Sequence, residues 1–346
     1  MNFPKGAVWQ SCREHALISI TDASSFSPHN PLTLTNWRQR GSFSVVTASS
    51  KGFTLHCSAA EIGSAMLGDI EYLFNHIAEH RALVHDVIKG TQWNSPAWLL
   101  VTIYYWGLFA ALIWTRLLGK GIIYLDRQSV RDLRTLASTT SGSPSGGGTY
   151  RIGIGEDLSA TSREVMLEKL AASHFHECAW QQIIRDAKCR FDQYADEDTD
   201  KTEFRMFRCL AFPGHATTDA WPSELRNAVN YRPGFAYTQV IKAPGLDLIQ
   251  FIRNHPFRSV EDVVDTYELE LNKITSVSSI ATTPSSYSKV MFLKATILTS
   301  LCEELFAEVL QIRRLDPRWS NKRASFYKER GIQREGKVWP IENKEC

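Results

Sequence analysis

Hydrophobic and polar residues follow two different patterns along the chain, one strand-like and one helix-like. Residues 1–56 are rich in Ser and Thr, and the runs 42–48 and 52–57 flank a short polar turn, which predicts a β-hairpin. The run 16–20 could supply a third strand. From residue 58 to Gly90 apolar residues recur every three or four positions, which predicts a long amphipathic helix. The chain is therefore expected to begin with a small β-rich arm and to continue as helix.

The helical pattern continues through most of the remaining sequence. Ser95 is an N-cap residue followed by proline, which predicts the start of a second helix that ends near Gly119. The Ser- and Gly-rich residues from 138 to about 155 predict a flexible loop. Further helices are predicted over residues 161–195, 223–231, 259–274 and 288–313. The fold class is thus predicted to be mainly α. The predicted domains are the β-rich arm, a helical bundle and a basic C-terminal extension, over residues 1–56, 57–313 and 314–346.

Most of the second predicted helix lies in a stretch without charged residues. The 24 residues 92–115 are long enough to cross a bilayer, so a single membrane span is an alternative. Against it, Tyr104, Tyr105 and Trp106 lie mid-stretch, whereas membrane helices concentrate Tyr and Trp at the two interfaces. No second stretch of this kind occurs, and the first residues lack the pattern of a signal peptide. A helix buried in a protein core is favoured, and no membrane association is expected.

The composition is that of a globular protein. Hydrophobic residues make up 43% of the 346 residues and charged residues 22%, which excludes a disordered chain and permits one large core or two smaller ones. The net charge is +2, but residues 311–346 alone carry +5, so any affinity for polyanions is expected there. The seven cysteines form no Cys-x-x-Cys pair, which indicates a reducing compartment, the cytoplasm, rather than a disulfide framework.

Two short motifs stand out within the predicted bundle. Residues 104–111 read Tyr-Tyr-Trp-Gly-Leu-Phe-Ala-Ala, in which small residues let neighbouring helices approach while the rings fill the gaps. Residues 225–235 place Arg226, Asn227 and Tyr231 on about two turns of a helix, just before a proline. Both motifs resemble those of the HEPN superfamily (higher eukaryote and prokaryote nucleotide-binding domains), helical bundles many of whose members cut RNA.

The resemblance implies a metal-independent ribonuclease site. In HEPN ribonucleases an Arg and a His lie near the start of a helix, and two copies usually meet across a dimer interface. A ribose 2′-hydroxyl attacks the adjacent phosphate, an imidazole acts as acid or base, and a guanidinium holds the phosphate oxygens. Here Arg226 would hold the phosphate, Asn227 matches the polar residue that often follows the Arg, and Tyr231 stands where the His is expected. No metal or other cofactor is implied.

The Tyr in place of the His changes the expected chemistry. A phenol, with an ordinary pKa near 10, is a poor base at neutral pH, so the change should cost about 10²-fold or more in acid–base catalysis. Arg232 could lower that pKa, and His215 could act as a substitute base. The catalytic candidates are therefore Arg226, Asn227, Tyr231 and His215. A structural role, in which Arg226 bridges helices and Tyr231 packs with its hydroxyl bonded, is the alternative.

The basic tail is a second candidate site for nucleic acid. Its cations alternate with aromatic residues, a composition typical of proteins that bind single strands. A solvated helical face or a docking arm for a protein partner would have the same composition. The candidate contacts, together with Arg232, are Arg313, Arg314, Arg318, Trp319, Lys322, Arg323 and Tyr327.

No metal site is predicted. His76 and His80, and likewise His174 and Cys178, are four residues apart, as two ligands on one helix face can be. Neither pair has further ligands at a recognisable spacing.

A phosphate-binding loop is not predicted either. The glycines of residues 146–155 lack the Lys and Ser/Thr of such a loop.

Three functions are consistent with these observations. The favoured one is a subunit of a bacterial conflict or anti-phage defence system that binds RNA or a protein partner and has a decayed catalytic motif. The defence role is implied by the resemblance alone. The first alternative is a metal-independent endoribonuclease, a toxin or effector, that uses Arg226 and Tyr231. The second is a single-pass membrane effector. A homodimer, or a hetero-oligomer with a defence-system partner, is expected.

Overall fold

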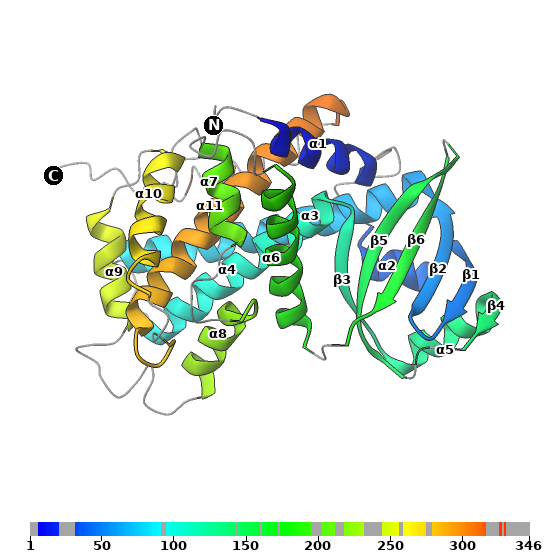
Figure 1. Ribbon diagram of the computed structural model, residues 1–346, viewed down its shortest axis with the longest axis horizontal. Helices are drawn as coiled ribbons and strands as arrows, with labels where there is room; N and C mark the ends of the chain where they lie inside the picture. Colours follow the sequence, from blue (N-terminus) through cyan, green and yellow to red (C-terminus); the bar gives the residue numbers. More distant parts are fainter. Residues whose placement is uncertain are drawn as a thin grey trace.

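The chain folds into a group of helices packed beside a six-stranded sheet (Figure 1). The computed structural model describes residues 6–20, 32–90, 95–142, 144, 146–159, 161–171, 174–194, 202–211, 218–231, 244–255, 259–274, 279–315, 325–326 and 329. The helices are α1 (Ala7–Ser19), α2 (Leu34–Arg40), α3 (Ala59–Lys89), α4 (Pro96–Leu117), α5 (Arg127–Leu136), α6 (Phe175–Gln193), α7 (Thr202–Ala211), α8 (Trp221–Tyr231), α9 (Pro244–Asn254), α10 (Val260–Leu271) and α11 (Pro284–Ile312). The strands are β1 (Phe43–Ser49), β2 (Gly52–Ser58), β3 (Lys120–Leu125), β4 (Ala137–Ser141), β5 (Gly148–Ser159) and β6 (Ser162–Lys169).

The prediction of a mainly α protein is wrong, because the sheet is a major part of the fold. Its strand order is β3-β5-β6-β2-β1-β4, with β1 and β4 parallel and every other pair antiparallel. Four of the six strands come from sequence beyond the predicted arm of residues 1–56. The predicted hairpin is confirmed as β1 and β2. The predicted strand over residues 16–20 is wrong, since Ala16 to Ser19 belong to α1. The chain is therefore an α/β protein.

Strands β5 and β6 lie where a loop and the start of a helix were expected. In β6, Val165 and Leu167 are buried while Met166 is 49% exposed, the two-residue alternation of a strand with one face on a core. The long helix predicted over residues 161–195 is therefore wrong in its first part, and α6 begins only at Phe175. The glycines of β5 weaken its strand signal, but the strand is hydrogen-bonded on both sides, to β3 and to β6.

Helix α3 joins the two halves of the molecule. Its early residues, among them Ile62 and Met66, belong to the core between the sheet and helices α2 and α5, while Ile70 and later residues belong to the core of the helical half. We call α4, α6–α11 and the later part of α3 the helical half. Gly68 lies at the crossover, and a Cβ there would be 2.1 Å from the carbonyl oxygen of Leu32, so only glycine allows this approach. Figure 1 shows α3 running from the sheet into the helices.

Helix α4 is the central helix of the helical half. It is long and apolar enough to cross a membrane, but 78% of its most apolar segment is buried inside the protein, as in the core helix of a soluble protein. The indole of Trp106 donates a 2.7 Å hydrogen bond to Thr299 on α11. A Cβ at Gly107 would lie 2.4 Å from Met291 Cε and 3.2 Å from Ala295 Cβ, so this glycine lets α11 pack closely. The structure thus supports the core-helix interpretation over the membrane span.

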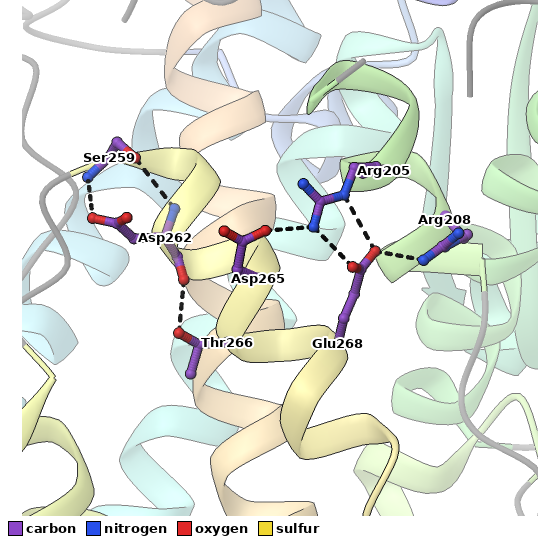
Figure 2. Close-up of polar contacts among 7 residues, drawn as sticks. All are labelled: Arg205, Arg208, Ser259, Asp262, Asp265, Thr266 and Glu268. Carbon is purple, nitrogen blue, oxygen red and sulfur yellow. Dashed lines mark hydrogen bonds and ion pairs between the residues drawn. The ribbon is translucent and has the colours of Figure 1, made fainter. Parts of the chain in front are cut away.

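Ion pairs tie α7 to α10 at the surface of the helical half (Figure 2). Arg205 Nη2 lies 2.8 Å from Glu268 Oε2 and 2.5 Å from Asp265 Oδ1, and Arg208 Nη2 lies 2.6 Å from Glu268 Oε1. The α10 helix begins with a capping box, in which Ser259 and Asp262 exchange hydrogen bonds. Both arginines have carboxylate partners within the protein, which fits a structural role.

Candidate functional site

Helix α8 presents the predicted motif on its outer side. Leu225 and Val229 are buried at helical spacing and fix α8 against the core. Arg226 is half-buried, Asn227 is exposed and the Tyr231 side chain is 70% exposed. The three predicted polar side chains therefore lie at the boundary between the core and solvent, where a ligand could reach them.

The guanidinium of Arg226 is held by three neutral oxygen acceptors. Nη2 donates to the hydroxyl of Tyr105 on α4 at 3.2 Å, and Nη1 donates to Asn227 Oδ1 at 3.0 Å and to the hydroxyl of Tyr231 at 3.4 Å. Its Cζ also lies 6.0 Å from the ring centroid of Tyr105 and 5.5 Å from that of Tyr231, within cation–π range. We call Tyr105, Arg226, Asn227 and Tyr231 the Arg226 cluster.

No carboxylate in the described part of the chain pairs with Arg226. Its Nε is buried and has no hydrogen-bond partner among the described residues. Burial opposes the charge, but the hydroxyls of Tyr105 and Tyr231 outweigh it and leave the pKa of Arg226 raised. The side chain is thus a fixed cation whose charge no anionic side chain among the described residues neutralises. Such a guanidinium suits a bound phosphate or carboxylate, whose oxygens match its planar fork.

A histidine that the sequence does not assign to the site lies beside the cluster. His176 belongs to the first turn of α6, and its ring centroid is 5.8 Å from that of Tyr105, edge to face. Burial and the charge of Arg226 lower the pKa of His176 below its ordinary 6.5. The imidazole is therefore neutral at pH 7, the form that can accept a proton. The N-terminus of α6 adds positive potential to that of Arg226.

Tyr104 connects the two motifs found in the sequence. Its hydroxyl lies 3.2 Å from Ser223 Oγ, at the start of α8, and burial raises its pKa to about 12. It therefore stays protonated and acts as a hydrogen-bonded spacer between α4 and α8. Together with the bond between Tyr105 and Arg226, it brings the residues 104–111 motif against the Arg226 motif, more than a hundred positions later.

Of the tail candidates, the structure describes Arg313 and Arg314, and Arg313 contacts α1 rather than this cluster. Arg313 directly follows the last residue of α11. Its Nη2 donates a 2.5 Å hydrogen bond to the carbonyl oxygen of Leu17, near the end of α1. Figure 1 shows this end of α11 beside α1, across the molecule from α8. Arg314 follows with a positive φ of 52°. The remaining predicted site residues lie outside the described residues: the substitute base His215 and the nucleic-acid contacts Arg232, Arg318, Trp319, Lys322, Arg323 and Tyr327.

The histidine pairs considered as metal ligands have other contacts. His76 stacks on Phe109 at 4.9 Å between ring centroids, and His80 Nδ1 lies 2.9 Å from the carbonyl oxygen of His76. Cys178 is 3% exposed, and burial raises the pKa of its thiol. Among the residues that the structure describes, no group of three or more His, Cys, Asp or Glu side chains is arranged to hold a metal ion.

Two residues of the site are missed by sequence reasoning, and each had a signal. Tyr105 lies within the aromatic motif of residues 104–111, but nothing in the sequence pairs it with Arg226. His176 lies in the run His174-Phe175-His176, where the expected long helix placed it in the middle of a helix rather than in a first turn facing α4.

The arrangement can hold an anion and move a proton next to it. Arg226 offers charge and N–H donors, His176 a neutral imidazole, and Tyr231 an exposed phenol. Comparisons of the chain with protein-family models, with curated proteins and with solved structures gave no match. The function of the site therefore has to be inferred from its own geometry.

Proposed function

We propose that the protein binds RNA and that Arg226 holds a backbone phosphate at this site. The observation that carries the proposal is the guanidinium of Arg226, which lies at the surface, is oriented by three neutral acceptors and has no carboxylate partner in the described chain. A polyanion gains most from a cation of this kind, because the charge is oriented in advance and none of the described carboxylates neutralises it.

The sequence resemblance supports RNA over other polyanions. The two motifs that resemble HEPN proteins meet in space, through Tyr105 and Arg226 and through Tyr104 and Ser223. We extend the proposal accordingly to a cytoplasmic subunit of a bacterial conflict or anti-phage defence system. It would act as a homodimer or beside a defence-system partner. This wider role rests on the resemblance and not on the geometry.

A second candidate function, a metal-independent endoribonuclease, is favoured by the position of His176. Its neutral imidazole could take the proton of a ribose 2′-hydroxyl as that oxygen attacks the adjacent phosphorus. The bond from phosphorus to the 5′-oxygen would break, and Tyr231 could give a proton to the departing oxygen. The products would be a 2′,3′-cyclic phosphate and a 5′-hydroxyl end, with Arg226 holding the phosphate oxygens throughout.

A binding titration with a matched pair of variants tests the proposal. The full chain is titrated into a labelled single-stranded RNA of mixed sequence in EDTA. Arg226→Ala should weaken binding roughly 10- to 100-fold, as expected for the loss of about 1.5–3 kcal/mol of hydrogen bonding to a charged group. Arg208→Ala removes the same charge from a carboxylate-paired site and should leave binding nearly unchanged. Absence of RNA binding, or equal losses in both variants, contradicts the proposal.

The same samples separate the two candidate functions. If the RNA stays intact, the protein is a binding subunit. If it is cut in EDTA to 2′,3′-cyclic phosphate ends, and both Arg226→Ala and His176→Gln abolish cutting without loss of fold, the protein is an endoribonuclease.

A further inference from the structure

A continuous strip of aromatic rings extends from the Arg226 cluster across α4 and α3. We call Tyr72, His76, His80, Tyr105 and Phe109 the aromatic strip. Tyr72 meets His76 edge to face at 4.5 Å between centroids, and His76 stacks on Phe109 at 4.9 Å. His80 lies 5.3 Å from Phe109 and 6.3 Å from Tyr105, and Tyr105 lies 6.0 Å from Phe109. Since Tyr105 also binds Arg226, the rings and the cation form one connected surface.

The α3 part of the strip lies on the outer face of that helix, and Tyr105 and Phe109 of α4 lie half-buried beside it. Tyr72, His76 and His80 are spaced four residues apart on α3, so they share one face, while the intervening Leu73 and Ile77 are buried in the core. The Tyr72 side chain is 55% exposed and that of His76 is 30% exposed. The outer face of a helix in a globular protein is usually charged or polar. Here a phenol and two imidazoles occupy it, and with the α4 rings they offer flat surfaces next to the Arg226 cluster.

The α4 side of the strip extends this surface. Trp98 lies seven residues before Tyr105 on the same face of α4, and its side chain is 61% exposed. Burial lowers the pKa of His80, so this ring is neutral at pH 7 and adds no charge to the strip. Glu79 contacts His76 at the edge of the strip, 3.6 Å from Nδ1. A polyanion would therefore place its phosphates toward Arg226 and away from this carboxylate.

We propose that the aromatic strip is a stacking platform for the unpaired bases of a single-stranded polynucleotide whose backbone phosphate is bound by Arg226. The proposal rests on the proposed function and specifies which part of the RNA the site takes. Tyr72 to His80 span about 12 Å of helix, the length of roughly three stacked bases. Rings that accept any base by stacking, next to one cation for the backbone, bind single strands with little sequence preference. A duplex would hide its base faces from the strip.

The experiment compares two probes that differ only in their bases. One is a fluorescein-labelled RNA octamer of adenosines, and the other is an octamer of the same backbone without bases. The variant is Tyr72→Ala/His76→Ala, two outer-face positions where alanine favours the helix. The control is Tyr124→Ala on β3, which removes a ring that is 63% exposed on the sheet side of the molecule. Binding is measured by fluorescence anisotropy in EDTA, with thermal melting as the check on folding.

The double variant should bind the adenosine octamer roughly tenfold or more weakly, from stacking worth about 1–3 kcal/mol per base, and the abasic octamer about as well as the unaltered chain does. Tyr124→Ala should change neither. Equal losses for both probes, or no loss for the adenosine octamer, would overturn the platform. So would a change of oligomeric state in sedimentation velocity with unchanged octamer binding, because the strip would then be an interface between copies of the chain. Arg226→Ala should weaken the binding of both octamers. If it weakens the binding of neither, while the double variant still binds only the adenosine octamer less tightly, the phosphate site at Arg226 is contradicted and the stacking platform is not.

Discussion

Arg205 and Arg226 are two arginines of the helical half in opposite electrostatic surroundings. Arg205, on α7, faces the acidic helix α10 and pairs with Asp265 and Glu268 (Figure 2). Arg226, on α8, faces two phenols and a carboxamide and has no carboxylate partner among the described residues. Carboxylate hydrogen bonds, despite partial burial, raise the pKa of Arg205, whereas only neutral groups orient Arg226.

Under the proposed function, Arg205 serves the fold and Arg226 serves a ligand. A guanidinium between two carboxylates has its charge satisfied within the protein and holds α7 to α10. A guanidinium oriented by neutral hydroxyls keeps its full charge for an incoming anion. Sequence alone does not separate the two, since both arginines lie on short helices with apolar residues on the other face.

The largest expected effect is on stability, at the Arg205 side of the comparison. Glu268→Ala removes the carboxylate shared by Arg205 and Arg208 and should lower the free energy of unfolding by roughly 1–3 kcal/mol. Tyr105→Phe removes one hydrogen bond to Arg226 and should cost about 1 kcal/mol or less. Urea denaturation measures both. A loss for Tyr105→Phe as large as that for Glu268→Ala would show that the Arg226 cluster, too, is structural.

A smaller effect is expected when Arg226 is given a carboxylate partner. Asn227→Asp keeps the shape of the side chain that accepts a 3.0 Å hydrogen bond from Arg226 Nη1, but makes it an anion. RNA affinity should fall about tenfold, equal to about 1.4 kcal/mol, because the new carboxylate competes with phosphate. Stability should change by less than about 1 kcal/mol, since the pair is exposed. Unchanged RNA affinity in a filter-binding assay would mean that Arg226 does not contact the phosphate backbone of the RNA.

The smallest effect concerns protons on His176. Arg226→Ala removes the second cause of its lowered pKa, so the pKa of His176 should rise in that variant, while burial keeps it below 6.5. NMR titration of the imidazole Cε1–H signals measures it, with the His176→Gln protein identifying the resonance. If the pKa of His176 is the same in Arg226→Ala as in the unaltered chain, the charge of Arg226 does not act on His176.

The same shift predicts how stability depends on pH. Between the lowered pKa of folded His176 and about 6.5, the unfolded chain binds more protons than the folded one. The free energy of unfolding should therefore fall as the pH drops from 7 through this window. His80 contributes in the same direction, so the contribution of His176 is the difference between the unaltered chain and His176→Gln. A pH dependence identical in the two proteins would contradict the shift.

Local signals predicted some parts of the fold well. Gly90 and Ser95 mark the end of α3 and the start of α4, because caps and helix breakers act within a few residues. The β1–β2 hairpin is equally local. The parallel pairing of β1 with β4 joins segments about ninety residues apart, and no local pattern specifies such a partner. The alternation in residues 162–169 was readable as a strand, but its apolar residues also fit a helix.

The candidate site divides in the same way. Arg226, Asn227 and Tyr231 are predictable because they lie within two turns of one helix. Tyr105 and His176 join them from α4 and α6, through contacts that depend on how three helices pack. Chemistry that lies on one element can be inferred from spacing, whereas a site assembled from several elements needs the fold.

The most direct test of the account is the salt dependence of RNA binding in two charge-matched variants. For single strands the slope of log K against log salt concentration changes by about 0.7 for each phosphate contact. Arg226→Ala should reduce the magnitude of the slope by about that amount, and Arg208→Ala, whose charge Glu268 neutralises, should leave it unchanged. An unchanged slope in Arg226→Ala, or an equal reduction in both variants, would contradict the claim that Arg226 is the arginine kept for phosphate.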